Sequence, residues 1–577
     1  MSRWFIKGLQ ADVNKISREN NISRELAVLL AKRGLTDKKE IDFFLDPSLD
    51  RLYKPELLKD VIIAGDILQD CIDHQKKIRI IGDYDVDGIS SVYILYKSLR
   101  RVGALVDYVI PDRIQDGYGI NRFLVLEAKA QGVDTLVTVD NGISAVDQIK
   151  IAKEMGMRTI ITDHHDVPEN LPTADAIIDP KQKECKYPEK ILCGAGIALK
   201  LSIHILERYG IDALEGDVLE IAAIATICDV VDLIGENRII TTNGLIQLNH
   251  TGNIGLRALI DLSGLKDKQL GIYHVGFIIG PSLNASGRLD SALIGLELLL
   301  CESYQEAEIL AQKLRLLNEE RQMLTKDGVE RIEKLLNSGQ GIQDVIVVYD
   351  PQIHESVAGI VAGRLKEKYN RPTIVMTKGK DGVKGSARSI EGYHIFEELR
   401  KASHLLLQFG GHPMAAGLSM NEKNIADLRD FLNENSKFSE EDLIPSIYID
   451  LPFDPVEVDW QFLDDIKRLE PFGKGNPKPL FGHKGLKVHR ASLLGKNSKV
   501  LKLIVGNNAN ERLEGIIFSD PEAWIEKAIE SFGEPDVARA MDGVENSIRM
   551  DIAYHPSVNE YMGKKSIQFV IDSYRFI

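Results

Sequence analysis

Three apolar runs in the first third of the chain each lead directly into carboxylate or imidazole side chains. Residues 78–81 precede Asp83, Asp85 and Asp87, residues 136–139 precede Asp140, and residues 159–162 precede Asp163, His164 and His165. Segments with helical spacing, residues 121–131 and 144–155, separate these runs. The alternation predicts an α/β fold with a parallel sheet built by right-handed crossovers. Because the carboxyl ends of parallel strands share one edge of a sheet, we expect these side chains to converge there.

The first group lies in a dense acidic motif between Gly82 and Gly88, followed by a helix-like segment over residues 89–101. Carboxylates this close together repel one another and lose solvation when they are buried, and a bound cation removes both penalties. Taken alone, the motif is equally compatible with an acidic, solvated turn. The expected convergence with the other two groups favours a metal site.

A further carboxylate, Asp229, lies in the apolar segment of residues 219–232. The segment is apolar enough to be buried, and a buried carboxylate without a partner is costly. An aspartate that caps a helix or forms a salt bridge is the alternative. We favour a metal ligand that completes the cluster.

The ligand types of this cluster also indicate which metal it binds. Oxygen-rich sites with one imidazole favour Mg²⁺ or Mn²⁺, whereas zinc prefers tetrahedral sets of thiolate and histidine. The five cysteines, which form no Cys-x-x-Cys pair, are Cys71, Cys185, Cys193, Cys228 and Cys301. We therefore expect buried, reduced thiols rather than a zinc site.

Length and charge limit the remaining possibilities. The 577 residues exceed what one core accommodates and suggest three or four domains. The chain has neither an apolar signal core at its start nor a run that approaches the roughly twenty apolar residues of a membrane span, which predicts a cytoplasmic protein without a membrane anchor. A net charge of −15 argues against bulk attraction of nucleic acid, so a polyanionic substrate requires local positive charge. Residues 364–388 are rich in Lys and Arg, although a solvated basic face is the usual alternative.

We divide the chain into five parts. These are a helical leader (1–58), the parallel-sheet domain (59–235), a helical connector (236–340), a second α/β unit (341–440) and a strand-rich tail (445–577). The connector contains an amphipathic segment over residues 302–337, interpreted as a spacer helix between two lobes or as a core helix. In the second α/β unit, residues 385–389 and 410–417 read as glycine-rich turns whose N–H groups approach phosphate oxygens. The short strands of the tail predict a small barrel.

Four motifs, DYDVDG, VDNGIS, TDHH and ICDVVDL, resemble those of the DHH phosphoesterase superfamily. Over nearly its whole length the chain is similar to the RecJ family of bacterial single-strand-specific exonucleases. The resemblance implies a DHH-type catalytic domain, a long connecting helix, a DHH-associated substrate domain and a C-terminal oligonucleotide-binding (OB) barrel.

The resemblance also implies two metal ions, each Mn²⁺ or Mg²⁺, and assigns their ligands. Asp85 and Asp140 would hold one ion, and the second would be held by Asp87, Asp140, His164 and Asp229, with Asp140 as the bridge. Some relatives have a histidine four residues before the position of Asp85. This chain has Ile81 there, and its side chain cannot bind a metal ion. Asp83, Asp163 or His165 would therefore complete or support the ligand set of the first ion. Two ions about 3.5 to 4 Å apart can activate water and stabilise the charge of phosphodiester cleavage.

The resemblance further implies a set of substrate-binding residues. Arg113, in the loop of residues 111–119, would share the terminal 5′-phosphate of the substrate with Ser386 and Arg388, because a guanidinium suits bidentate phosphate binding. Arg288 would reach the nucleic-acid backbone, and His412 would face the cleft. The alternatives are an ordinary surface arginine at 113, a structural turn with a salt bridge to Asp290 for Arg288, and a turn histidine at 412.

From these parts we expect a single-stranded-DNA-specific 5′→3′ exonuclease that releases 5′-mononucleotides in DNA recombination and repair. Its partners would be single-stranded DNA with a 5′ end and, by family resemblance, a single-strand-binding protein and a repair helicase; we expect a monomer. One alternative is a DHH phosphodiesterase that acts on cyclic dinucleotides or very short oligonucleotides. Another is a non-catalytic replication scaffold, which should have lost the metal ligands that this chain keeps.

Overall fold

The computed structural model describes residues 2–113, 117, 119–380, 382–439, 441–495, 499–508, 510–518, 520–561 and 563–577. The chain forms two compact units, residues 48–445 and residues 2–47 together with 446–577. Within the described ranges, no helix combines the length and the apolar character needed to cross a lipid bilayer. The division into five parts made from the sequence stays a prediction.

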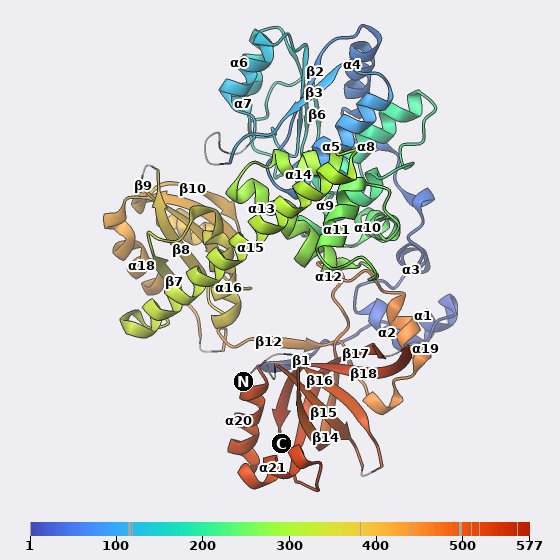
Figure 1. Ribbon diagram of the computed structural model, residues 1–577, viewed down its shortest axis with the longest axis vertical. Helices are drawn as coiled ribbons and strands as arrows, with labels where there is room; N and C mark the ends of the chain where they lie inside the picture. The colour runs from blue at the N-terminus through green and yellow to red at the C-terminus, as the bar shows by residue number, and fades with distance from the viewer. Residues whose placement is uncertain are drawn as a thin grey trace. The chain divides into compact units, whose positions relative to one another are not determined.

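The first unit begins with a sheet of five parallel strands, which confirms the expected α/β class. Its order is β3 (Val106–Val109), β2 (Ile78–Ile81), β4 (Thr135–Val139), β5 (Arg158–Thr162) and β6 (Ala176–Ile178). One face is covered by α4 (Val61–Asp73), α5 (Val86–Arg101) and α8 (Gly194–Arg208), and the other by α6 (Arg122–Ala130) and α7 (Val146–Glu154) (Figure 1). The strand order reverses between β2 and β4, the point at which such sheets bind ligands.

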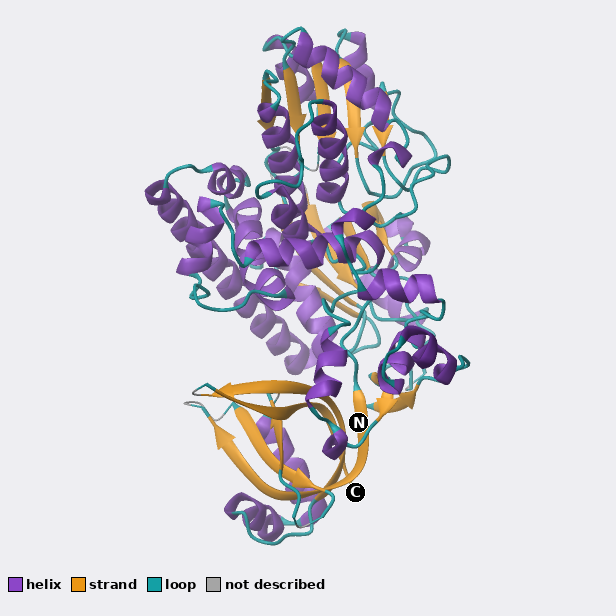
Figure 2. Ribbon diagram, turned by 90° about the vertical axis from the view of Figure 1, so that its right-hand side faces the viewer, coloured by secondary structure: helices purple, strands orange, loops and turns teal. Residues whose placement is uncertain are grey.

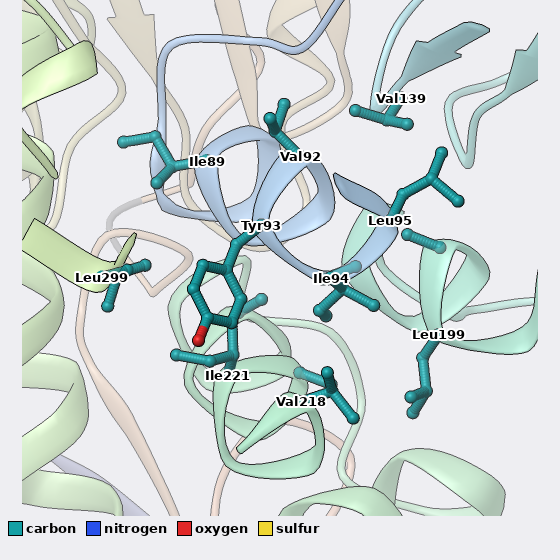
Figure 3. Close-up of a cluster of buried hydrophobic side chains, with 14 of the residues drawn as sticks. Ile89, Val92, Tyr93, Ile94, Leu95, Val139, Leu199, Val218, Ile221 and Leu299 are labelled. Carbon is teal, nitrogen blue, oxygen red and sulfur yellow. The ribbon is translucent and has the colours of Figure 1, made fainter. Parts of the chain in front are cut away.

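Helix α5 anchors the first acidic motif to the core. It begins at Val86, three residues before the predicted start, because the Asp85 side chain caps its first turn. Most of its length is buried, and its side chains pack against α8, α9 and the sheet, as Figure 3 shows around Tyr93 and Val92. Each buried aliphatic side chain contributes about 1.5–3 kcal/mol, so the helix start is firmly held. The Tyr93 hydroxyl donates to Asp217 Oδ2 at 2.6 Å.

A helical region follows the sheet. Its members are α9 (Val218–Cys228), α10 (Gly235–Leu248), α11 (Ile254–Leu262), α12 (Ile272–His274), the π-helical turn η3 (Val275–Ile279), α13 (Gly280–Leu289), α14 (Leu293–Leu300) and α15 (Tyr304–Leu335). The long helix α15 confirms the predicted connecting helix. Ala307 and Leu314 pack into the core of the first lobe, whereas Ile332 packs into a core of the second. The spacer interpretation therefore describes it better than a plain core helix.

The second lobe of this unit has a mixed sheet. Its order is β10 (Leu406–His412), β11 (Ala415–Met420), β9 (Gly382–Arg388), β8 (Thr373–Gly379) and β7 (Ile346–Tyr349), with only β7 and β8 parallel. Its helices are α16 (Ala358–Tyr369), α17 (Ile395–Lys401) and α18 (Ile425–Glu434). Cores on both faces of the sheet hold the lobe together.

The prediction of glycine-rich turns in this lobe is wrong. Gly385 and Ser386 lie inside strand β9, and Gly410 in β10 is paired with Gly417 in β11. Within residues 410–417, only residues 413–414 form a turn, at the hairpin between β10 and β11. Glycine in a strand allows close approach of a neighbouring group, and a side chain at Gly385 would press on Met376 and Leu418.

The second unit is built around a closed barrel, as predicted. Strands β14 (Phe481–Leu494), β15 (Val500–Gly506), β16 (Leu513–Ile517), β18 (Lys564–Phe576) and β17 (Arg549–Tyr561) pair in this order, and β17 pairs back to β14 (Figure 2). The short strand β13 (Leu451–Pro452) extends β14. Helices α19 (Trp460–Lys467), α20 (Pro521–Phe532) and α21 (Glu534–Asp542) accompany the barrel. The sequence analysis described this tail as strand-rich and did not predict its helices α19, α20 and α21.

The N-terminal residues belong to the core of this barrel unit. Helices α1 (Val13–Asn20), α2 (Arg24–Ala31) and α3 (Lys38–Leu45) contribute Ile16, Leu26 and Ile41 to the same hydrophobic cluster as Phe462 and Leu469. In addition, β1 (Arg3–Ile6) pairs in parallel with β12 (Ser446–Ile449), a strand pair that the helical prediction for this segment missed.

Candidate active site

The predicted metal ligands converge at one edge of the parallel sheet. Three groups have ligand atoms within 4.8 Å of one another: Asp83, Asp85 and Asp140; Asp87, His164 and Asp229; and Asp140, His164 and His165. Asp140 and His164 each belong to two groups, so the three form one continuous cluster. The carboxyl ends of β2, β4 and β5 therefore bring together residues that are far apart in the sequence.

Two aspartates of the first motif are held by helix N-termini. Asp85 Oδ1 accepts from the N–H of Asp87 at 2.9 Å and of Gly88 at 3.1 Å, at the start of α5. Asp87 is buried and accepts from two amides of the first turn of α8, from Gly194 at 2.6 Å and from Ala195 at 2.8 Å. Unpaired N–H groups and the helix dipole both favour a negative charge at these positions.

Asp140 follows β4 in the left-handed backbone region, with φ +60°. Its buried carboxylate faces the start of α8, where a Cβ at Gly194 would lie 2.6 Å from Asp140 Cβ and 2.8 Å from its Oδ1. Only glycine fits this position without moving the carboxylate. Sequence reasoning missed Gly194, whose only signal is a glycine in the first turn of an apolar helix.

The two histidines of the third motif have different surroundings. His164 Nε2 lies 3.1 Å from Asp140 Oδ1 and 3.7 Å from Asp87 Oδ2, and its Nδ1 lies 3.8 Å from Asp229 Oδ2. Burial lowers the pKa of His164, which favours the neutral, ligating form. Burial acts in the same direction on His165, but the hydrogen bond and charge of Asp163 outweigh it and raise the pKa of His165 to about 9.

Asp163 lies at the same sheet edge but belongs to none of the three groups. Its Oδ1 accepts from His165 Nδ1 at 2.6 Å and from the N–H of His164 at 2.8 Å, and its Oδ2 accepts from the N–H of Ile143 at 2.9 Å. These bonds occupy both oxygens, so Asp163 orients the histidines rather than facing an ion.

The expected burial of Asp229 is wrong, because α9 ends at Cys228 and leaves Asp229 as its C-terminal cap, with a side chain 25% exposed. The carboxylate still reaches the cluster. Ile81 is fully buried among the side chains under α6 and α7, so it takes no part in the site. Asp83 is in the group with Asp85 and Asp140, where a residue that replaces the absent histidine ligand was expected.

The electrostatics of the cluster fit a divalent cation. Burial and the neighbouring Asp85 carboxylate raise the pKa of Asp83 to about 8. Burial also raises the pKa of Asp87, and burial with several carboxylate neighbours raises that of Asp140. Among the described residues, buried Asp83 Oδ1 has no hydrogen-bond partner. A carboxylate oxygen at such a site is a suitable ligand for Mg²⁺ or Mn²⁺.

Three arginines of the substrate set have no carboxylate partner among the ion pairs of the described residues. The Arg113 guanidinium lies 5.1 Å from the ring centre of Tyr84. Arg288 donates to the Ser356 carbonyl at 3.0 Å, and burial together with Arg113 lowers the pKa of Arg288 to about 10. Arg388 donates to the carbonyl of its neighbour Ala387 at 2.8 Å, and its partial burial lowers its pKa.

The proposed salt bridge between Arg288 and Asp290 does not form. Arg288 lies inside helix α13, and Asp290 pairs with Lys313 at 2.8 Å. The buried cation is therefore available to an anion. Side chains at Ser386 and Arg388 both border Gly359, which places them next to each other.

A cavity of about 450 Å³ lies between the two lobes of the first unit. Tyr84 and Arg113 line it from the catalytic lobe, and Ser386, Gln408 and Lys384 line it from the second sheet. His412 is exposed and lies 3.3 Å from Asp166 of the catalytic lobe, so it faces that lobe rather than serving only as a turn residue. Residues 114–116 and 118 of the Arg113 loop lie outside the described residues.

Comparisons with known proteins agree with this architecture. The chain matches the DHH family N-terminal domain over residues 77–226, the DHHA1 domain over residues 343–437 and the RecJ OB domain over residues 449–573. The single-stranded-DNA-specific exonuclease RecJ of Bacillus subtilis is 36% identical over 99% of this chain and 70% of its own length. The RecJ of Haemophilus influenzae is 34% identical over 94% of this chain and 95% of its own length.

Solved structures give the same result. The crystal structure of RecJ from Thermus thermophilus in complex with Mn²⁺ aligns with a TM-score of 0.83 at 28% identity, over 99% of this chain and 79% of that chain. A second crystal structure, exonuclease RecJ bound to manganese, has a TM-score of 0.58 at 34% identity, over 67% of this chain and 96% of that chain. With three domain matches and relatives above 30% identity over nearly its full length, the chain belongs to the RecJ family of single-stranded-DNA-specific exonucleases.

Proposed function

We propose that this protein is a metal-dependent 5′→3′ exonuclease that hydrolyses single-stranded DNA to 5′-mononucleotides in recombination and repair. The observation that carries the proposal is the pairing of two features within one unit. A carboxylate and imidazole cluster suited to divalent cations lies near arginines that have no carboxylate partner among the described ion pairs, beside a cavity lined by both lobes.

The ligands that fit two ions are assigned as follows. Asp83, Asp85 and Asp140 would hold one ion, and Asp87, Asp140, His164 and Asp229 would hold the other. Bound Mn²⁺ or Mg²⁺ would lower the pKa of a water and neutralise charge on the phosphodiester during hydrolysis. The retained carboxylates argue against a non-catalytic scaffold.

The chain's own groups fix this geometry before substrate arrives. The α8 amides hold Asp87, and Asp163 holds the two histidines through three hydrogen bonds. His165, with its raised pKa, is protonated at neutral pH and would offer a positive charge to the scissile phosphate. Such preorganised groups lose little free energy to reorganisation during the reaction.

The arginine set would hold the 5′ end. Arg113, Arg288 and Arg388 would bind the terminal phosphate together with the Ser386 hydroxyl, and His412 would border the entry to the cavity. The barrel would hold a more distant part of the strand, as OB folds bind single strands in a basic, aromatic groove.

The wider assignments are part of the same proposal. A 5′→3′ exonuclease of this kind would act as a monomer in the cytoplasm, with single-strand-binding protein and a repair helicase as partners. Sedimentation of the purified protein, alone and with each partner, tests the monomer and the two complexes.

The test of the activity uses a 3′-labelled single strand with a 5′-phosphate and Mn²⁺ or Mg²⁺. Wild-type protein should shorten the strand from the 5′ end and release mononucleotides, and Asp140→Asn should abolish the reaction. Asp179→Asn is the matched control, because Asp179 is also a buried carboxylate at this sheet edge but lies outside the three groups. Endonucleolytic products, or equal loss in both variants, would contradict the assignment.

A further inference from the structure

One face of a single helix joins the proposed 5′-phosphate site to an exposed pair of aromatic rings. Segments α12, η3 and α13 follow one another without a break from Ile272 to Leu289. Residues at intervals of three or four share a helix face. In α13 this series is Pro281, Asn284 and Arg288; Phe277 lies within the preceding π-helical turn, and Tyr273 lies on the other side of that turn.

The C-terminal part of this face belongs to the active site. Asn284 Oδ1 accepts from the N–H of Val86, next to Asp85, at 3.0 Å. Arg288 lies close enough to Arg113 for their charges to repel, which contributes to the lowered pKa of Arg288. This end of the helix is therefore fixed beside the metal cluster and the proposed phosphate site.

The N-terminal part presents bare aromatic surface. Tyr273 and Phe277 are each 64% exposed, and their rings stack with centres 5.1 Å apart and planes 25° apart. Burying two such rings would be favourable, yet the fold leaves both open. Two exposed, nearly parallel rings are the arrangement on which nucleobases stack.

The helix is widened at this point by its own sequence. Pro281 has no N–H to donate to the Phe277 carbonyl, and the backbone before it forms the π-helical turn η3. Turns of this kind inside helices occur frequently at functional sites. Gly276 and Gly280 lie against Ile227 and Cys228 at the end of α9, so the π-helical turn packs against the helix that precedes Asp229.

The residue after Asp229 is exposed and has a strained backbone. Val230 is 59% exposed and has φ +56°. A β-branched residue rarely adopts the left-handed region, and such strain persists mainly at functional sites. An exposed valine in a strained turn thus adds apolar surface directly after Asp229.

The spacing along the helix suits a single strand. Phe277 and Arg288 are separated by about 17 Å of helix, which corresponds to about five stacked nucleotides at about 3.4 Å each. Near the aromatic end Lys268 lies close enough to His274 to lower its pKa together with burial, and so supplies a cation for backbone phosphates.

We propose that Tyr273 and Phe277 form a stacking site for the bases of single-stranded DNA on the 3′ side of the cleaved bond, with the strand running along the helix face from Arg288. This inference rests on the proposed exonuclease function and adds a base-binding site outside the metal cluster. In this proposal the aromatic pair positions the DNA strand and takes no part in the hydrolysis.

The test compares an intact strand with one that lacks bases at the second to fifth nucleotides. Both carry a 5′-phosphate and a 3′ fluorophore, and equilibrium binding is measured by anisotropy in EDTA, so no cleavage occurs. Wild-type protein should bind the abasic strand roughly ten-fold more weakly, since each stacked base contributes substantially to affinity. The Tyr273→Ala, Phe277→Ala double variant should bind the intact strand roughly ten-fold more weakly than wild type and no longer discriminate between the strands. Tyr273→Phe with Phe277→Tyr should restore discrimination.

The matched control is Ile246→Ala, a residue of α10 that is 60% exposed. This variant should still bind the intact strand more tightly than the abasic strand. Equal binding of both strands by wild type, or undiminished discrimination in the double alanine variant, would overturn the proposal and would favour a protein partner for this surface. Failure of the exonuclease proposal is distinct, because it would appear as absence of metal-dependent cleavage by wild type with either strand.

Discussion

Replacement of Gly194 by alanine should disable the metal cluster with little effect on the fold. The new Cβ would lie 2.6 Å from Asp140 Cβ and 2.8 Å from its Oδ1. Carbon atoms pack at about 3.5–4.0 Å, so the Asp140 carboxylate or the start of α8 must move by about 1 Å. A displacement of this size in a catalytic group costs about 100-fold in rate.

The stability cost should be smaller. Overpacking of a core costs about 1–3 kcal/mol, and the better helix propensity of alanine offsets up to about 1 kcal/mol of this. We therefore expect kcat/KM on a 5′-phosphorylated single strand to fall by about 100-fold, whereas urea unfolding without metal should change by no more than about 2 kcal/mol. Addition of Mn²⁺ should stabilise wild type against urea and should stabilise Gly194→Ala much less.

Gly196→Ala provides the matched control on the same helix. A Cβ there would meet Leu192 at 3.4 Å, which is close to ordinary contact, so activity and the response to Mn²⁺ should match wild type. The steric reasoning would be refuted if Gly194→Ala kept wild-type kcat/KM, or if Gly196→Ala lost as much.

Further predictions concern charge. Asp87→Asn should fold but lose stabilisation by Mn²⁺ and at least about 100-fold of activity, because losing a ligand costs no less than losing a residue that supports one; thermal unfolding and a cleavage assay would show this. Arg388→Ala should remove the preference for a 5′-phosphate over a 5′-hydroxyl end, and an unchanged KM ratio for the two ends would exclude Arg388 from phosphate binding. Lys200→Met should lower the free energy of unfolding by about 3–5 kcal/mol, because it leaves the fully buried Glu236 carboxylate without its cation; urea titration measures this. Because Asp83 has a pKa of about 8 in the folded protein against an ordinary value of 3.8, the folded state binds more protons between these pH values, so stability without metal should fall as the pH rises from about 4 to 8. Urea unfolding at a series of pH values measures this dependence, and Mg²⁺ should reduce it. A stability that rises with pH over this range would show that the Asp83 carboxyl is ionised in the folded protein.

The local pattern of the sequence determined the catalytic lobe. Short β-branched runs, helical spacing between them and acidic residues at their ends are enough to predict a parallel sheet, since crossovers of this length have one favoured hand and place all carboxyl ends at one edge. The convergence of Asp83, Asp140 and His164 follows from that topology without knowledge of any side-chain contact. The small barrel was predictable for a similar reason, because closely spaced short strands must close to remove their edges.

Other features depended on contacts between distant segments. Gly385 reads as a turn residue from the sequence, and only the strands that pair beside it show that it leaves space for Met376 and Leu418. The strand Arg3–Ile6 is only four residues long, too short to be recognised from Trp4, Phe5 and Ile6 alone, and its partner Ser446–Ile449 lies more than four hundred residues later.

The details of the site were likewise decided by tertiary packing. That Gly194 must be glycine follows from Asp140, more than fifty residues earlier, lying against the first turn of α8. The exposure of Tyr273 and Phe277 is equally invisible in the sequence, where two aromatics at helical spacing indicate a buried face. The sequence thus specified which elements form and which polar groups they carry, because these depend on neighbouring residues. Which side chains touch, and which remain open to a ligand, was decided by packing between segments that the sequence keeps far apart.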